Sequence, residues 1–239
     1  MKKHNIIKLL LFVILLCVTG IYLIINADND LPPGEGLKIV KYPGNFAAFK
    51  FMTKNGAIIV ADPYGMTEYV RADVVTISHH HGDHCDMSHI QGSPIVLDKA
   101  DAIEHKGILI RGVAGVHNKG DIHTTNVIFM YNLCGIRLAH FASQGDVPTE
   151  AMYDLIGTVD VLLIQCIDIP SKLSPDEVIG IARRLKAKIV IPEHGRQGLL
   201  EKRKDFFSGN IKNIKSGEMR ITKKELSAIH APMIINLDM

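Results

Sequence analysis

A run of histidines at the end of an apolar strand is the feature that most constrains this chain. Residues 73–78 are apolar and β-prone, and they lead directly into His79-His80-His81-Gly82-Asp83-His84. Alternate side chains at a strand end can point the same way, so His79 and His81 can converge on one cation. Asp83 and His84 point elsewhere and can hold a second cation, whereas His80 is a spacer. Imidazole and carboxylate groups suit Zn²⁺, and Mn²⁺ or Fe²⁺ accept the same ligand types.

The remaining pattern predicts a β-rich domain with one clear helix. Ser174-Pro175-Asp176-Glu177 is typical of a helix start, and apolar residues follow at helical spacing. Asn55-Gly56 and residues 132–135 predict tight turns. Since no helical pattern separates the strands before the histidines, a layered α/β sandwich is favoured over a doubly wound sheet. Other predicted strands cover residues 37–42, 47–52, 57–61, 108–110, 127–133, 136–140, 159–165 and 188–192, with a last run at 232–237 closing a sheet edge or lying beside the first strands.

The first 30 residues predict a signal-anchor. Three lysines at positions 2, 3 and 8 precede a stretch without charge from Leu9 to Ala27. As a helix this apolar core spans about 25 Å, and residues 6–25 together approach the thickness of a bilayer. We expect a linker at 31–36 and a folded domain at 37–239, anchored as a single-pass membrane protein with the domain outside the cytoplasm. The alternative is secretion after signal cleavage, although Ile25 stands where a cleavage site needs a small residue.

The charge balance argues against a nucleic-acid partner. The chain has 27 Lys and Arg against 25 Asp and Glu, a net charge of +2. Proteins that bind nucleic acids by neutralising phosphates carry a clear basic excess. We therefore expect no nucleic acid among its partners.

Residues 72–84 resemble the signature loop of the metallo-β-lactamase superfamily. The similarity is strongest to the branch of ascorbate-6-phosphate lactonases and N-acylphosphatidylethanolamine phospholipase D-like hydrolases. The resemblance implies an αββα sandwich with metals where the strand-end loops meet. Further matches follow in the family's order at residues 60–63, 113–117, 135–140, 160–164 and 189–194.

The resemblance also implies a ligand set. It assigns His79, His81 and His117 to a first metal, and it assigns Asp83, His84 and His194 to a second. His194 has independent support because it directly follows an apolar strand, where functional residues are often displayed. His117, a lone histidine in a glycine-rich stretch, depends on the resemblance, and His140 is assigned a supporting role.

One position departs from the family pattern. The family places an aspartate that bridges both metals three residues after the position of His140, and this chain has Ser143 there. A neutral hydroxyl holds two dications together less well than a carboxylate, so we expect a weaker second site. Asp146 could reach in instead if the loop were rearranged.

These features predict a metal-dependent hydrolase with one or two Zn²⁺ ions. A metal-bound hydroxide would attack an ester, lactone, amide or phosphodiester, and Asp83 would orient it and take up a proton. The expected partners are a small-molecule or lipid substrate, and the membrane through the N-terminal helix. The alternative is a metal-binding sensor or a non-catalytic member of the same fold, because Ser143 removes a family ligand.

Overall fold

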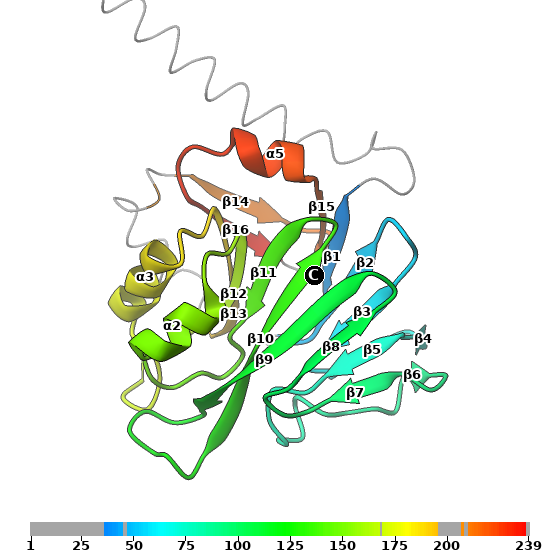
Figure 1. Ribbon diagram of the computed structural model, residues 1–239, viewed down its shortest axis with the longest axis horizontal. Helices are drawn as coiled ribbons and strands as arrows, with labels where there is room; N and C mark the ends of the chain where they lie inside the picture. The colour runs from blue at the N-terminus through cyan, green and yellow to red at the C-terminus, as the bar shows by residue number, and fades with distance from the viewer. Residues whose placement is uncertain (1–35, 45–46, 168, 196–206, 208–209, 238–239) are drawn as a thin grey trace, which may run out of the picture.

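Two mixed β-sheets stack face to face in the computed structural model, which describes residues 36–44, 47–167, 169–195, 207 and 210–237 (Figure 1). The smaller sheet has the strand order β15 (Glu218–Ile221), β1 (Leu37–Lys41), β2 (Phe49–Thr53), β3 (Ile58–Ala61), β5 (Val74–Thr76) and β7 (Ile95–Leu97). The larger sheet has the order β14 (Ile211–Ile214), β16 (Met233–Leu237), β13 (Ile189–Gly195), β12 (Val161–Cys166), β11 (Ile136–His140), β10 (Thr125–Leu133), β9 (Ile108–Val116) and β8 (Ala102–His105).

The main core lies between the two sheets and follows the two-residue period of the strands. In β12, Val161 and Leu163 join the core shared with the smaller sheet, and Leu162 and Ile164 face the opposite way. This strand is buried on both faces and pairs in parallel with β11 and β13, which explains its unbroken apolar sequence. A buried hydrogen bond of 2.7 Å between Thr76 Oγ1 and the Tyr131 hydroxyl joins the two sheets. It therefore fixes β5 against β10 immediately before the histidine run.

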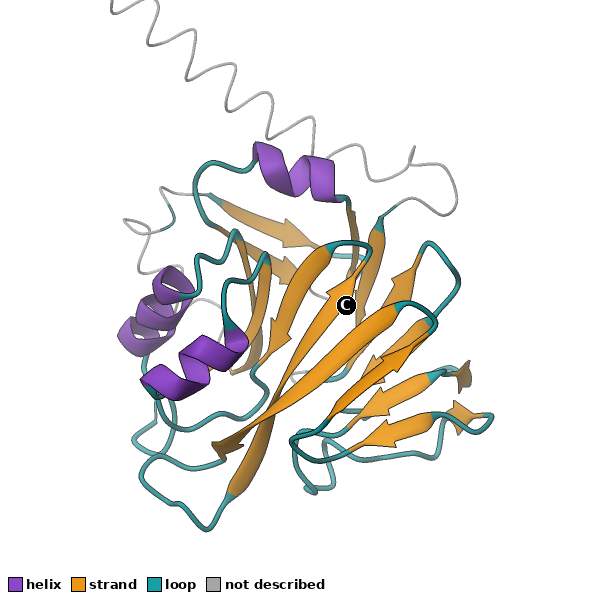
Figure 2. Cartoon of the chain, in the orientation of Figure 1, coloured by secondary structure: helices purple, strands orange, loops and turns teal. Residues whose placement is uncertain are grey.

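Two helices cover the outer face of the larger sheet, α2 (Glu150–Ile156) and α3 (Pro175–Arg184) (Figure 2). Val178 and Ile181 of α3 are buried in the same cluster as Leu162 and Ile164 of β12. Helix α5 (Lys223–Ala228) buries Leu226 at the end of the core between the sheets. Helices thus account for one outer layer of the sandwich.

The other outer layer is not helical in the described residues, so the expected αββα arrangement is confirmed only in part. Over the smaller sheet, the described residues are loops and a two-stranded sheet of β4 (Val70–Arg71) and β6 (Ile90–Gln91). Met66 and Val70 pack there against Val60 and Val75 of the sheet. These loop side chains bury the apolar face that a helix would otherwise cover, so no helix is needed on that side of the described structure.

Most expected elements of the sandwich are confirmed. Cys134 and Gly135 have positive φ angles of 54° and 75°, as a two-residue turn between β10 and β11 requires. The run at 232–237 forms β16, but the prediction of its place was wrong. It lies inside the larger sheet between β14 and β13, and β15 pairs with β1 instead. The sequence analysis missed α2 and the short strands β4, β6, β7, β8, β14 and β15.

The predicted membrane placement is contradicted by the structure. No helix in the described part of the chain is long and apolar enough to cross a membrane. The longest helix there, α3, has 10 residues, or about 15 Å, against a hydrocarbon core of about 30 Å. The expected anchor at 1–30 lies outside the described residues.

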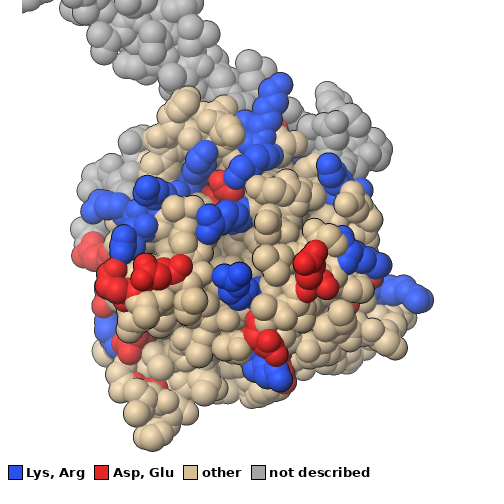
Figure 3. Space-filling view, in the orientation of Figure 1, with Lys and Arg blue, Asp and Glu red and all other residues tan. Residues whose placement is uncertain are grey.

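Basic and acidic side chains both occur across the face shown in Figure 3. Ion pairs link several elements of the described structure, such as Lys119 with Glu177 and Lys223 with Asp160. Surface pairs of this kind contribute little to stability individually. The sandwich therefore depends chiefly on its apolar cores.

The start of α3 gives the first testable prediction. Ser174 Oγ accepts a hydrogen bond from the Glu177 backbone N–H, and the Glu177 carboxylate accepts one from the Ser174 N–H at 2.8 Å. We expect Ser174→Ala to lower the free energy of unfolding by about 1 kcal/mol because both contacts of the capping box are weakened. Urea unfolding measures the change. Ser93→Ala, at an exposed loop position, is the control, and an equal effect in both variants would contradict this account of the helix start.

Candidate metal centre

Three histidines from two strand ends form the first group of candidate ligands. His79 and His81 follow β5, and His117 follows β9 directly. Their three ring centroids lie 4.6 Å from one another, and one possible ligand atom from each falls within 4.8 Å of the others. His79 is only 5% exposed, whereas His81 is open to solvent. The group therefore closes at the base and opens toward the surface.

Asp83, His84 and His194 form the second group. One possible ligand atom from each again lies within 4.8 Å of the others. The Nε2 atoms of His84 and His194 are 3.0 Å apart, and Asp83 Oδ2 is 3.8 Å from His84 Nε2. The His79 and His84 rings are 4.0 Å apart, so the two groups adjoin. The structure thus brings together the same two sets of residues that the sequence analysis proposed, and their role as metal ligands stays a prediction.

A buried carboxylate sets the orientation of the histidines. Asp62 follows β3, is completely buried and has a positive φ of 45°. Its oxygens accept hydrogen bonds from the Ser78 N–H at 2.7 Å, the Ser78 hydroxyl at 2.6 Å and His84 Nδ1 at 2.7 Å. Burial alone would raise the pKa of Asp62, but the hydrogen bond from His84 and the other groups around it hold that pKa below its ordinary value. Asp62 is therefore an anion that only accepts hydrogen bonds.

This arrangement determines which ring nitrogens carry protons. The Ser78 hydroxyl donates to Asp62, so it accepts from His79 Nδ1 at 2.9 Å. His84 donates from Nδ1 to Asp62. Asn118 Oδ1 lies 3.1 Å from His117 Nδ1 and can accept from it. In all three histidines the proton belongs on Nδ1, which leaves the Nε2 lone pair available as a ligand.

A buried histidine nitrogen without a hydrogen-bond partner supports a metal at this site. His79 Nε2 is buried and has no hydrogen-bond partner among the described residues. Burial lowers the pKa of His79 to about 2 and that of His117 to about 4, and it also lowers the pKa of His194. A buried neutral imidazole without a partner is costly, and a metal ion would use its lone pair. The donor set of histidines and one carboxylate therefore fits a divalent metal such as zinc or iron.

Ser143 occupies the position at which the family pattern has its bridging aspartate. It is 5% exposed, and its turn is held by buried amide groups, with Asn126 Nδ2 bonded to the Phe141 carbonyl and Gln165 Nε2 to the Gln144 carbonyl. Asp146 does not reach in, because its carboxylate accepts the Gly120 N–H at 2.9 Å and belongs to neither ligand group. The bridging position therefore carries a neutral side chain.

Three supporting residues were not given a role by the sequence analysis. Glu193 accepts from His140 Nε2 at 2.9 Å in a fully buried pair. Burial lowers the His140 pKa, but Glu193 and Asp62 together hold that pKa above its ordinary value. Lys172 places its ammonium beside His117 and Ser143, and burial lowers its pKa to about 8. Asp62 is the third. The family motif at 60–63 includes Asp62 and could have identified it, whereas no sequence pattern indicated a role for Lys172.

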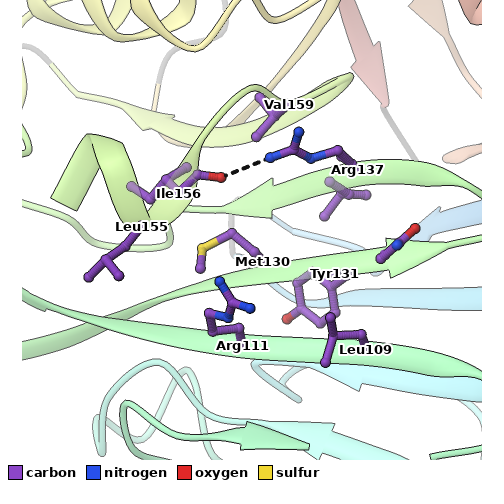
Figure 4. A pocket seen from close by; sticks show the side chains of 10 residues that line it. Leu109, Arg111, Met130, Tyr131, Arg137, Leu155, Ile156 and Val159 are labelled. Atoms are coloured by element: carbon purple, nitrogen blue, oxygen red, sulfur yellow. Dashed lines mark hydrogen bonds between the residues drawn. The ribbon is translucent and has the colours of Figure 1, made fainter. Parts of the chain in front are cut away.

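A separate pocket lies on the outer face of the larger sheet, between α2 and strands β9–β11 (Figure 4). Its wall includes Leu109, Met130 and Leu155, and Arg137 donates from Nη2 to the Ile156 carbonyl at 3.2 Å. It contains no residue of either histidine group. The chemistry of the candidate metal centre is therefore elsewhere in the fold.

The fold and the site together define an α/β sandwich protein of the metal-binding class. A family model described as a β-lactamase superfamily domain matches residues 41–194, which is more than half of the chain. The chain therefore belongs to the metallo-β-lactamase superfamily. No curated protein matches it in sequence.

Solved structures agree with this family. A candidate Zn-dependent hydrolase of the superfamily from Thermotoga maritima is 26% identical, with a TM-score of 0.68 over 84% of this chain and 98% of that one. A candidate metal-dependent hydrolase from Parabacteroides distasonis is 20% identical, with a TM-score of 0.57 over 70% of this chain and 86% of that one. A diiron β-hydroxylase from Streptomyces venezuelae is 14% identical, with a TM-score of 0.53 over 71% of this chain and 46% of that one. The last two show the shared fold alone.

Removing the charge of Asp62 tests its orienting role. We expect Asp62→Asn to weaken metal binding by about 10- to 100-fold, because an amide N–H in place of one carboxylate oxygen would face a donor, so the three hydrogen bonds from Ser78 and His84 cannot all be kept. Competition with a chromogenic chelator measures the affinity. Asp154→Asn, an exposed change on α2, should leave it unchanged. Wild-type affinity in Asp62→Asn would show that His84 is oriented by other contacts.

Restoring a carboxylate at position 143 tests the missing bridge. We expect the wild-type protein to hold its second metal weakly and Ser143→Asp to hold it more tightly, because a carboxylate attracts both cations. Mass spectrometry of the intact protein counts bound metal per chain. Ser143→Asn adds similar bulk without charge and should behave like the wild type, and a tightly held second metal in the wild type would refute the expectation.

Proposed function

We propose that this protein is a metal-dependent hydrolase, with Zn²⁺ as its metal. The observation that carries the proposal is the set of Nε2 atoms in His79, His84 and His117, each left unprotonated by a partner on the other nitrogen. Such preorganisation of histidines is typical of metal sites. Mn²⁺ and Fe²⁺ are the alternatives that the same donors accept.

In this proposal the chain's residues divide between holding the metal and moving a proton. His79, His81 and His117 would hold one ion, and Asp83, His84 and His194 would hold a second. A bound divalent metal lowers the pKa of its water toward neutrality and polarises the bond to be cleaved. Asp83 is partly exposed at the open side of its group, where its carboxylate can accept a proton from the attacking water.

The candidate substrates are an ester, a lactone, an amide or a phosphodiester in a small molecule or a lipid. The finer placement near the ascorbate-6-phosphate lactonases and phospholipase D-like hydrolases belongs to this proposal, and it is supported by the motif at 72–84. The competing proposal is a metal-binding sensor, which Ser143 favours because it removes a family ligand. The open position of His81 favours the hydrolase, since a purely structural metal site is closed.

Hydrolysis of generic phosphodiester and ester reporters tests the enzyme proposal. We expect His81→Ala to lose both bound metal and at least 100-fold in kcat/KM, because its imidazole is one of three ligands in the first group. His230→Ala, an exposed histidine outside both groups, should keep both. Full metal loading without hydrolysis of any reporter would favour the sensor, and undiminished hydrolysis in His81→Ala would refute the assignment of the site.

A further inference from the structure

A buried lysine faces the first histidine group from a neighbouring loop. Lys172 lies in the loop between β12 and α3 and is 8% exposed. Its Nζ donates to the His117 carbonyl at 2.6 Å and lies 3.3 Å from the Ser143 carbonyl. The loop itself is held by hydrogen bonds from the Lys172 N–H to the Ile169 carbonyl and from the Lys119 N–H to the Ser171 carbonyl. The ammonium is therefore fixed in place between a candidate ligand and the residue at the bridging position.

The ammonium leaves the His117 ligand atom available. Its nitrogen is 3.3 Å from both Nδ1 and Nε2 of His117. A point equally distant from both ring nitrogens lies along neither lone pair, so Lys172 does not occupy the direction in which Nε2 would bind a metal. Two of the three ammonium hydrogens can point to the carbonyls of His117 and Ser143, which leaves one for a further acceptor.

The charge of Lys172 has no counterpart in the part of the chain that the structure describes. No described carboxylate forms an ion pair with it, and its polar contacts with described residues are two carbonyls and an imidazole. A buried charge is costly unless it is paired. The position from which the family's aspartate would face this region carries the neutral Ser143. An anion supplied by a ligand would complete the site.

We propose that Lys172 binds an anionic oxygen of a phosphoryl group in the substrate, beside the first histidine group. The inference rests on the proposed function and narrows its substrates to phosphate esters, since neutral esters, lactones and amides carry no such oxygen at the bond to be cleaved. A compact ammonium suits phosphate oxygens as a point charge. Lys172 is thereby a substrate-binding residue that selects for charge.

Binding of inorganic phosphate to the metal-loaded protein tests this proposal, with calorimetry as the measurement and bound metal counted in each sample. We expect Lys172→Met to weaken phosphate binding at least tenfold at unchanged metal content. Lys119→Met is the matched control, because it removes the same charge from a nearby exposed lysine, and its affinity should stay within twofold of the wild type. If Lys172→Met does not fold, Lys172→Gln is used in its place, because glutamine keeps an N–H donor for the His117 carbonyl.

Other results would contradict the proposed contact between Lys172 and a phosphoryl group. Phosphate binding that is absent in the wild type, unchanged in Lys172→Met or equally weakened in Lys119→Met would exclude a specific contact. Loss of metal together with phosphate would assign Lys172 to metal retention. Acetate binding with the same affinity and the same dependence on Lys172 would exclude selection for a phosphoryl group. Failure of the hydrolase proposal is seen separately, as undiminished reporter hydrolysis in His81→Ala.

Discussion

The hydrogen bonds to the buried Asp62 carboxylate are the interaction on which the rest of the site depends. They connect the end of β3 to the loop that follows β5, and they determine the proton positions on His79, through Ser78, and on His84. A single carboxylate thus orients one histidine in each ligand group. Its left-handed backbone conformation is unfavourable for a residue with a side chain, as is that of His194, and such strain persists only where surrounding contacts compensate.

The sequence revealed the strands and the candidate ligands because both depend on local patterns. Apolar runs mark the strands, and the spacing from His79 to His84 brings four of the six candidate ligands into one loop. The outer layer over the smaller sheet could not be predicted in this way, because Met66 and Val70 acquire their partners only when distant loops pack. Lys172 was missed for the same reason, since 55 residues separate it from His117. Similarly, the place of β16 is set by pairing with β13 and β14, to which its own sequence gives no guide.

The turn around Ser143 is fixed by buried amide groups, and they hold Asp146 outside the candidate site. Gln144 packs its side-chain oxygen 2.1 Å from the position that a Cβ on Gly115 would occupy, and it donates to the Asp146 carbonyl at 2.9 Å. Asn126 donates to the same Gln144 side chain at 3.2 Å. Because these buried amides satisfy one another, shifting the turn to insert Asp146 would leave several polar groups unpaired. The packing of this turn therefore explains why Asp146 does not take the place of the missing carboxylate.

The charges around this centre then bear on what it can bind. Asp62 is anionic behind the histidines, Asp83 lies at the open side of the second group, and Lys172 lies beside the first. A metal in the second group would be next to a carboxylate, whereas a metal in the first group would be held by neutral imidazoles with an ammonium close by. Since like charges repel most strongly where water is excluded, the first position gains most from an anionic ligand that contacts both the metal and Lys172. The missing carboxylate and the buried lysine thus both favour a substrate that brings a negative charge to the site.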